Sequence, residues 1–379
     1  MFLAVIASVL IYSWVTGVPL QTKGTPQFEV YKEWIVDTRI EDDNSFRKTH
    51  RMKPLLIENS VIQGNAIDGI VSYDRNTGRK LWNFAVVGGV ESGVVHVNDR
   101  LFFGGNDGKF YSININTGKL IWSFDAKTEV ISEPAIWDGI VYFLAGNNVF
   151  YALDAAEGRD LWIYSRVDSQ NFSIRGASTP VVINGILYMG FTDGYIVGLD
   201  AKSGAVKWEQ VLNKNKKFKD LDSSPIIDDD QIFITGYDSA IYSVNRMTGQ
   251  LIWKSDTGGY GDVLLYKDFL IYSTSQSQII ALNKTNGSKL WTYNLTDGVG
   301  NSPVIYQDKV VVTQSQGPVL FLNPTNGKLI TQFDSGRGSF SPLAIDQAKN
   351  ELYFISKEAL LYKLKTKERD LNQEIYFLQ

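Results

Sequence analysis

The residue types that carry most enzyme chemistry are scarce in this sequence. It contains no cysteine, and its only two histidines, His50 and His96, stand far apart. The lack of cysteine excludes a thiol nucleophile, a disulfide and a cysteine-based metal site, and two distant histidines exclude a histidine-rich metal site. The net charge is only −4 over 379 residues, which gives no strong bias toward nucleic acid. We therefore expect no catalytic residue, no cofactor, no metal and no nucleic-acid partner.

Two polar segments contain residue types that bind proteins. The first, residues 165–176, places two apolar side chains beside an arginine, and the second, residues 213–222, is a run of lysines that closes on two acids. An arginine among exposed apolar side chains is a common composition for the energetically dominant part of a protein interface. The predicted partner-binding residues are Phe172, Ile174, Arg175, Asp220 and Asp222.

The same residues also have a purely structural interpretation. Phe172 and Ile174 would pack beneath their own loop, Arg175 would pair with Asp220 or Asp222, and the lysines would be solvated. Both interpretations are compatible with the spacing.

A repeat of about 40 residues positions both segments. Its clearest copy is residues 151–162, in which a turn closes at Gly158 and Trp162 follows four residues later. A period near 40 with several short strands per unit is typical of a β-propeller. A seventh copy keeps the turn but has Thr331 at the tryptophan position. We expect the tryptophans to be structural and to pack between neighbouring blades; they are Trp34, Trp82, Trp122, Trp162, Trp208, Trp253 and Trp291.

Each repeat divides into four short strands, here called A to D. Pairs such as Asp138-Gly139 supply the positive φ angles that tight hairpins require. Residues 28–36 read as an isolated D strand, whereas residues 341–364 supply A, B and C strands without a D strand. The predicted fold is therefore an all-β, eight-bladed β-propeller of four-stranded antiparallel blades. Its ring is closed by the N-terminal strand, which completes the last blade and leaves no open sheet edge.

The two candidate segments are also the places where the repeat is lengthened. The interval from the D-strand tryptophan to the proline of the next A strand is 12 residues after Trp122 and Trp291. It is 18 residues after Trp162 and 17 after Trp208. All D-to-A connections emerge on one face of a propeller, so these two consecutive connections should stand side by side. Loops on a rigid scaffold are frequent binding sites.

The ends of the chain are predicted to lie outside the propeller, which is assigned to residues 23–366. Residues 2–18 are uncharged and largely apolar, so residues 1–22 are interpreted as a signal peptide or a membrane anchor. A buried strand is the alternative. Residues 367–379 are predicted to be a C-terminal tail. We expect the protein to be exported.

The repeats resemble the pyrroloquinoline-quinone-type propeller repeat, and the segments around Arg175 and Asp220 resemble paired segments of the BamB family. Members of that family are eight-bladed periplasmic lipoproteins of the outer-membrane β-barrel assembly machinery. The resemblance implies that Phe172, Ile174, Arg175, Asp220 and Asp222 bind a BamA-like barrel subunit. It also implies contact with other machinery subunits and a place on the periplasmic side of the outer membrane. The family is normally lipidated on a cysteine, which this sequence lacks.

Three functions compete at this point. The first is a non-catalytic, membrane-associated scaffold that binds the barrel subunit and helps to present unfolded outer-membrane proteins. The second is a quinoprotein dehydrogenase, which the repeat type alone would allow, although such enzymes usually carry a vicinal disulfide. The third is an envelope-anchored propeller that binds another protein, because a fold does not determine a function.

Overall fold

The computed structural model describes residues 27–40, 49–166, 178–213, 219–221, 223–236 and 240–369. The chain divides into two units, Val30–Lys365 and a second unit made of Met1–Glu29 and Thr366–Gln379. In the second unit only residues 27–29 and 366–369 are described, and they continue strands β1 and β32. The described residues form strands and turns, and none of them belongs to a helix that could cross a membrane.

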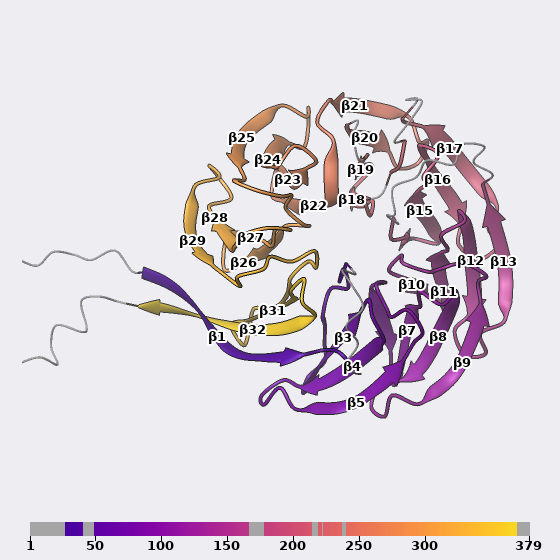
Figure 1. Cartoon of the computed structure of the whole chain (residues 1–379). Coiled ribbons are helices and arrows are strands. Elements are labelled where there is room, and N and C mark those ends of the chain that lie inside the picture. Colours follow the sequence, from indigo (N-terminus) through magenta and orange to yellow (C-terminus); the bar gives the residue numbers. More distant parts are fainter. Residues whose placement is uncertain are drawn as a thin grey trace, which may run out of the picture. The chain divides into compact units, whose positions relative to one another are not determined.

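The strands form eight four-stranded antiparallel sheets, which are the blades of a propeller (Figure 1). Blade 1 comprises β2 (Leu55–Leu56), β3 (Ser60–Asn65), β4 (Gly69–Asp74) and β5 (Lys80–Ala85). Blade 2 comprises β6 (Val94–Val97), β7 (Arg100–Gly104), β8 (Lys109–Asn114) and β9 (Leu120–Asp125). Blade 3 comprises β10 (Ala135–Trp137), β11 (Ile140–Leu144), β12 (Val149–Asp154) and β13 (Asp160–Ser165). Blade 4 comprises β14 (Val181–Ile183), β15 (Ile186–Gly190), β16 (Tyr195–Asp200) and β17 (Val206–Val211).

The remaining blades repeat this order. Blade 5 comprises β18 (Ile226–Asp228), β19 (Gln231–Thr235), β20 (Ile241–Asn245) and β21 (Leu251–Ser255). Blade 6 comprises β22 (Gly259–Tyr266), β23 (Phe269–Thr274), β24 (Gln278–Asn283) and β25 (Lys289–Asn294). Blade 7 comprises β26 (Val304–Tyr306), β27 (Lys309–Val312), β28 (Val319–Leu322) and β29 (Leu329–Phe333). Blade 8 comprises β30 (Ala344–Asp346), β31 (Glu351–Ile355), β32 (Leu360–Arg369) and β1 (Gln27–Asp37).

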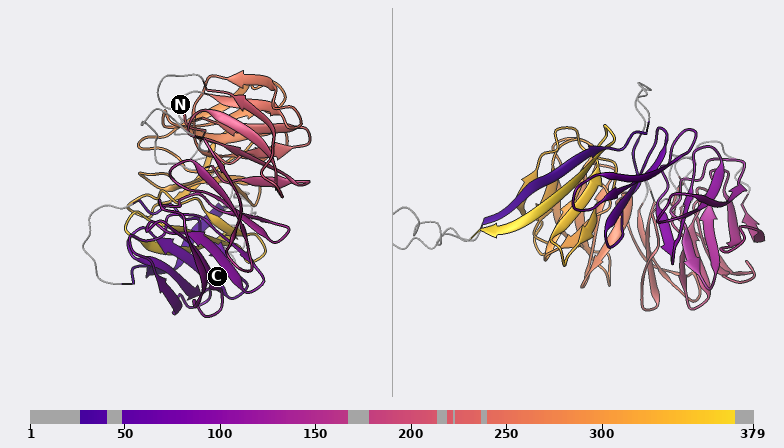
Figure 2. Two further views of the ribbon diagram at one scale, coloured as in Figure 1. Left: turned by 90° about the vertical axis from the view of Figure 1, so that its right-hand side faces the viewer. Right: turned by 90° about the horizontal axis from the view of Figure 1, so that it is seen from below.

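The eighth blade confirms the predicted closure of the ring. Its strand order is β1-β32-β31-β30, so the N-terminal strand β1 pairs with β32 near the other end of the chain (Figure 2). The first strand of blade 8, β30, contacts the first strand of blade 1, β2. The fold is therefore the all-β, eight-bladed propeller expected from the repeat.

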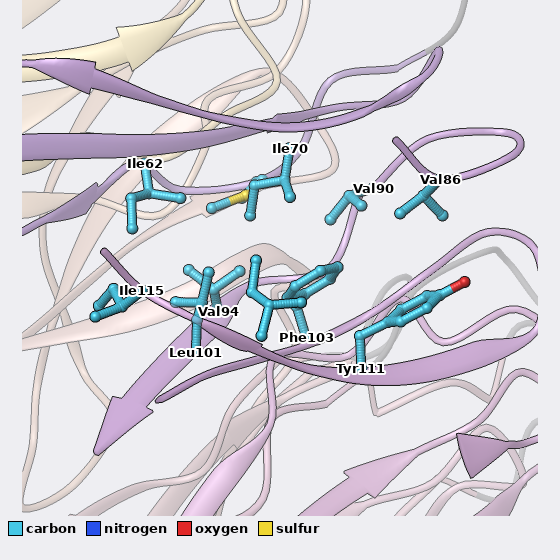
Figure 3. Packing of buried hydrophobic residues seen from close by; sticks show 11 residues of the cluster. Ile62, Ile70, Val86, Val90, Val94, Leu101, Phe103, Tyr111 and Ile115 are labelled. Carbon is cyan, nitrogen blue, oxygen red and sulfur yellow. The ribbon is translucent and has the colours of Figure 1, made fainter. Parts of the chain in front are cut away.

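The core lies between the blades. Between blades 1 and 2, Ile62 and Ile70 face Leu101 and Phe103, and all four side chains are fully buried (Figure 3). The middle strands of a blade are apolar runs such as Ile140–Leu144, because both of their faces are covered by neighbouring blades. The D strands, in contrast, alternate between exposed and partly buried residues, because they form the outer rim.

The turn before each D strand is built from the residues that the sequence marks. In blade 3, Oδ1 of Asp154 accepts hydrogen bonds from the backbone N–H groups of Ala156 at 2.8 Å and Glu157 at 2.9 Å. Gly158 closes the turn at φ 74°, a backbone conformation that favours glycine. The hairpin pair Asp138 and Gly139 has φ angles of 51° and 77°, as the pattern predicts.

Each repeat tryptophan reaches across to the next blade. Its indole Nε1–H donates a hydrogen bond to a carbonyl in the next blade's C-to-D turn, and its ring lies against the glycine of that turn. Trp122, for example, donates to the carbonyl of Ala155 at 3.2 Å and covers Gly158. The acceptors, in chain order of the tryptophans, are Arg75, Ile115, Ala155, Ala201, Arg246, Lys284 and Pro324.

This arrangement explains why blade 7 has Thr331 in place of tryptophan. The neighbour that would receive a tryptophan from blade 7 is blade 8, whose C and D strands are β32 and β1. These strands come from opposite ends of the chain, so no C-to-D turn joins them. A tryptophan in β29 would find neither the turn carbonyl nor the turn glycine.

Candidate protein-interaction site

The two enlarged connections follow β13 and β17 at the ends of blades 3 and 4. Residues 167–177, residues 214–218 and Asp222 lie outside the described residues, and with them the predicted binding residues Phe172, Ile174 and Arg175. Of the five predicted binding residues, the structure therefore places Asp220 alone. The described ends of both connections nevertheless show how they are attached to the propeller.

Arg166 begins the first enlarged connection and is bound to blade 4. Its Nε donates to Oδ2 of Asp193 at 2.6 Å, and its Nη1 donates to Oε2 of Glu209 at 2.7 Å. Nη1 also donates to the hydroxyl of Tyr164 at 3.1 Å. The guanidinium lies over the ring of Tyr195, 3.9 Å from its centroid, which adds a cation–π contact. The Arg166 and Asp193 side chains are only 14% and 12% exposed, so their ion pair is poorly screened by solvent, whereas Glu209 is 46% exposed.

The second enlarged connection is attached to the same part of blade 4. The backbone N–H groups of Leu212 and Asn213 donate to the carbonyl of Gly194 at 2.9 and 3.2 Å. At the far end, the N–H of Leu221 donates to the carbonyl of Phe191 at 3.2 Å. Residues 191–194 form the turn between β15 and β16, called the blade-4 turn from here on. Both connections thus meet on one turn.

Asp220 lies inside the protein. Its side chain is fully buried, as is that of the adjacent Leu221 at 1% exposure. A buried carboxylate does not present itself to a partner directly, so any contribution of Asp220 to binding would pass through the residues packed around it.

Sequence reasoning missed the pairing of Arg166 with Asp193. Arg166 lies in the first lengthened segment, and Asp193 lies in the Asp-Gly hairpin of the next repeat. Each residue therefore stands in a stretch that the repeat pattern marks. Their contact could not be read from that signal because 27 residues separate them and two different blades supply them.

Comparison with known proteins identifies the family. A family model described as outer membrane protein assembly factor BamB matches residues 68–293, which is more than half of the chain and includes both enlarged connections.

This chain belongs to the BamB family.

Individual BamB proteins match over shorter stretches. BamB of Legionella pneumophila is 24% identical over 124 residues, which is 31% of this chain and 32% of that protein. BamB of Escherichia coli is 23% identical over 146 residues, or 37% of each chain. The alignments thus span about a third of the length of these relatives.

Solved structures show that the fold is shared more widely than the BamB family. The crystal structure of BamB from Moraxella catarrhalis superposes with a TM-score of 0.76 at 19% identity, covering 89% of this chain and all of that one. The quinohemoprotein alcohol dehydrogenase of Comamonas testosteroni superposes with a TM-score of 0.72 at 11% identity, covering 88% of this chain and 76% of that one. At these identities the likeness demonstrates the fold alone.

A partly buried carboxyl group, that of Glu133, lies just before β10. The side chain of Glu133 lies directly over Gly93, since a Cβ atom at position 93 would come within 2.3 Å of Oε2 of Glu133. Burial raises the pKa of Glu133 to about 7; the charge of Lys53 opposes this shift and that of Asp262 adds to it. Glu133 therefore titrates near neutral pH in the folded protein.

We expect the Glu133→Gln variant to be more stable than the native protein at pH 8 and equally stable at pH 4. Folding raises the pKa from 4.5 to about 7, so the folded state holds the proton more tightly. The native protein consequently loses stability as the pH rises from 4.5 to 7, by about 3 kcal/mol, and the glutamine variant does not. Urea unfolding at several pH values measures the difference. Parallel pH profiles for the two proteins would contradict it.

Proposed function

We propose that this protein is a non-catalytic scaffold in the assembly of outer-membrane proteins. Its two enlarged connections would bind a BamA-like barrel subunit, with Phe172, Ile174, Arg175 and Asp222 in contact with the partner and Asp220 supporting them from within. The observation that carries the proposal is that both connections attach to one turn of blade 4. Membership of a family whose model is described as an assembly factor supports it.

The proposal places the protein on the periplasmic side of the outer membrane. Residues 1–22 would serve as a signal peptide or a membrane anchor, residues 23–366 as the propeller and residues 367–379 as a tail. Other subunits of the assembly machinery are proposed as further partners, and unfolded outer-membrane proteins as candidate substrates. A quinoprotein dehydrogenase shares the fold, and quinone titration with an assay of dye reduction tests that alternative.

The Arg175→Glu variant is expected to lose co-purification with a BamA-like protein while keeping its melting temperature. Reversing the charge of an interface arginine costs ~2 kcal/mol or more, which weakens binding by roughly 30-fold. Affinity capture of the tagged full-length chain from envelope extracts, with quantification of the captured protein, measures the loss.

The matched control for this experiment is Arg159→Glu. Arg159 is 61% exposed at the opposite end of β13, in the turn before that strand, so the same charge change is made away from both connections. Retained binding by Arg175→Glu, or equal loss by both variants, would show that the connections are not the interface. Capture of a different main partner would instead favour the envelope propeller with another function.

A further inference from the structure

We propose that Arg166 is a positioning residue of the partner-binding site, which holds both enlarged connections to the blade-4 turn so that they act as one unit. This inference rests on the proposed function, because it concerns the same binding site. It assigns a role to Arg166, Asp193 and Glu209 that the family resemblance does not include.

The contacts of Arg166 link two blades at the point where the first connection leaves. Arg166 follows β13 of blade 3, whereas its acceptors Asp193 and Glu209 belong to blade 4. The ion pair with Asp193 is largely protected from water, with the two side chains 14% and 12% exposed. A charge-assisted hydrogen bond of 2.6 Å in such a place is stronger than one at the surface. The starting point of the first connection is thereby held to the blade-4 turn.

A second bond steadies the same turn from blade 3. The side-chain amide of Asn148 donates to the hydroxyl of Thr192 at 2.5 Å, and Asn148 is 9% exposed. The backbone N–H of Arg166 in turn donates to the carbonyl of Asn148 at 3.4 Å. Arg166, Asn148 and the blade-4 turn are therefore joined in one hydrogen-bonded group.

The second connection depends on the same turn through its backbone. Gly194, which accepts from Leu212 and Asn213, directly follows Asp193, the acceptor of Arg166. Phe191, which accepts from Leu221, lies two residues before Asp193. A change in the position of the turn would consequently displace both ends of the second connection. Loss of the Arg166 guanidinium should therefore also affect the second connection, although Arg166 belongs to the first.

The test compares Arg166→Met with Lys284→Met in the full-length protein. Methionine keeps an apolar stem but removes the guanidinium. Lys284 of blade 6 pairs with Asp228 of blade 5 at 2.7 Å, with both side chains 28% exposed, so its replacement also breaks an ion pair between blades but touches neither connection. We expect Arg166→Met to weaken binding of the purified periplasmic part of a BamA-like protein by about tenfold. Lys284→Met should leave binding unchanged.

Amide hydrogen exchange separates positioning from direct contact. In Arg166→Met without partner, the amides of Leu212, Asn213 and Leu221 should exchange faster than in the native protein, because the carbonyls that they donate to are no longer held. Adding Asp193→Asn to Arg166→Met should weaken binding no further, since the two residues act as a pair.

Four outcomes would overturn the inference. Equal loss of binding in Lys284→Met would mean that a general loss of stability is responsible. Weaker binding with unchanged exchange of the three amides would mean that Arg166 touches the partner itself. Unchanged binding in Arg166→Met, in an assay where Arg175→Glu loses binding, would reject the positioning role and leave the proposed function intact. If neither Arg166→Met nor Arg175→Glu loses binding, both the positioning role of Arg166 and the proposed binding site are wrong.

Discussion

Replacing Lys363 with methionine is expected to lower the free energy of unfolding by about 3 kcal/mol, because the buried carboxylate of Glu351 then keeps only Tyr353 and an arginine, Arg75, that it shares with Asp346. Lys363 is 1% exposed, and its Nζ lies 2.7 Å from Oε2 of Glu33 and 2.8 Å from Oε1 of Glu351. The same Nζ donates to the backbone carbonyl of Arg75 at 2.8 Å. One side chain thus joins β1, β31 and β32 of blade 8 to blade 1.

The size of this effect follows from the way the ring is closed. Blade 8 has no covalent turn between its C and D strands, so β1 is held by its backbone pairing with β32 and by side-chain contacts. Burial by itself raises the pKa of Glu351, but hydrogen bonds from Lys363, Tyr353 and Arg75 outweigh it and lower the pKa, which keeps the carboxylate ionised. Arg75 also pairs with Asp346 at 2.7 Å, which extends the network across the junction.

The control for Lys363→Met is Lys365→Met. Lys365 pairs with the other oxygen of Glu33 at 2.8 Å, but the two side chains are 30% and 31% exposed. An ion pair that water reaches contributes about 1 kcal/mol or less. Urea unfolding of the two variants measures both changes. Equal losses would show that burial of the network is not what stabilises the junction.

The Gly158→Ala variant is expected to lose about 3 kcal/mol of stability through its contact with Trp122 and its backbone conformation. A Cβ atom at position 158 would lie 2.5 Å from Cδ2 of the indole, so blades 2 and 3 must move apart. Overpacking of this kind costs about 1–3 kcal/mol. The positive φ of 74° adds the strain of an L-residue in the left-handed region, about 1 kcal/mol.

Gly139→Ala separates the two contributions to that loss. Gly139 has almost the same φ, 77°, but a Cβ atom there would have nothing within 4 Å. Its variant should therefore lose only about 1 kcal/mol. In a Trp122→Ala background, Gly158→Ala should cost no more than Gly139→Ala, because the clash has been removed. Thermal unfolding of the four variants provides the measurement, and additive losses for Trp122→Ala and Gly158→Ala would contradict the proposed contact.

The recurring turn and tryptophan were sufficient to predict the fold. Asp154, Gly158 and Trp162 mark a local turn, and local backbone preferences can be read from neighbouring residues. Seven such turns indicated seven blades, and the unpaired strand around Trp34 together with the incomplete last repeat indicated an eighth blade that closes the ring. The repeat also showed that Thr331 replaces a tryptophan. The sequence did not show the reason, which is that the neighbouring blade lacks the turn against which that tryptophan would pack.

The sequence predicted where the candidate site lies in the chain, but not how its residues are packed. An insertion in a regular repeat is a local property, so the two long connections after Trp162 and Trp208 could be found by counting residues. The burial of Asp220 could not be predicted in this way, because burial depends on what packs around a residue.

The sequence by itself determined the all-β propeller, its eight blades, its closure and the location of the enlarged connections, since each of these repeats or breaks a local pattern. Only the tertiary structure decided that Arg166 pairs with Asp193 and that Lys363 joins Glu33 to Glu351. Such contacts connect residues of different blades or opposite ends of the chain. Their partners are set by the geometry of the closed ring, which no single stretch of sequence contains.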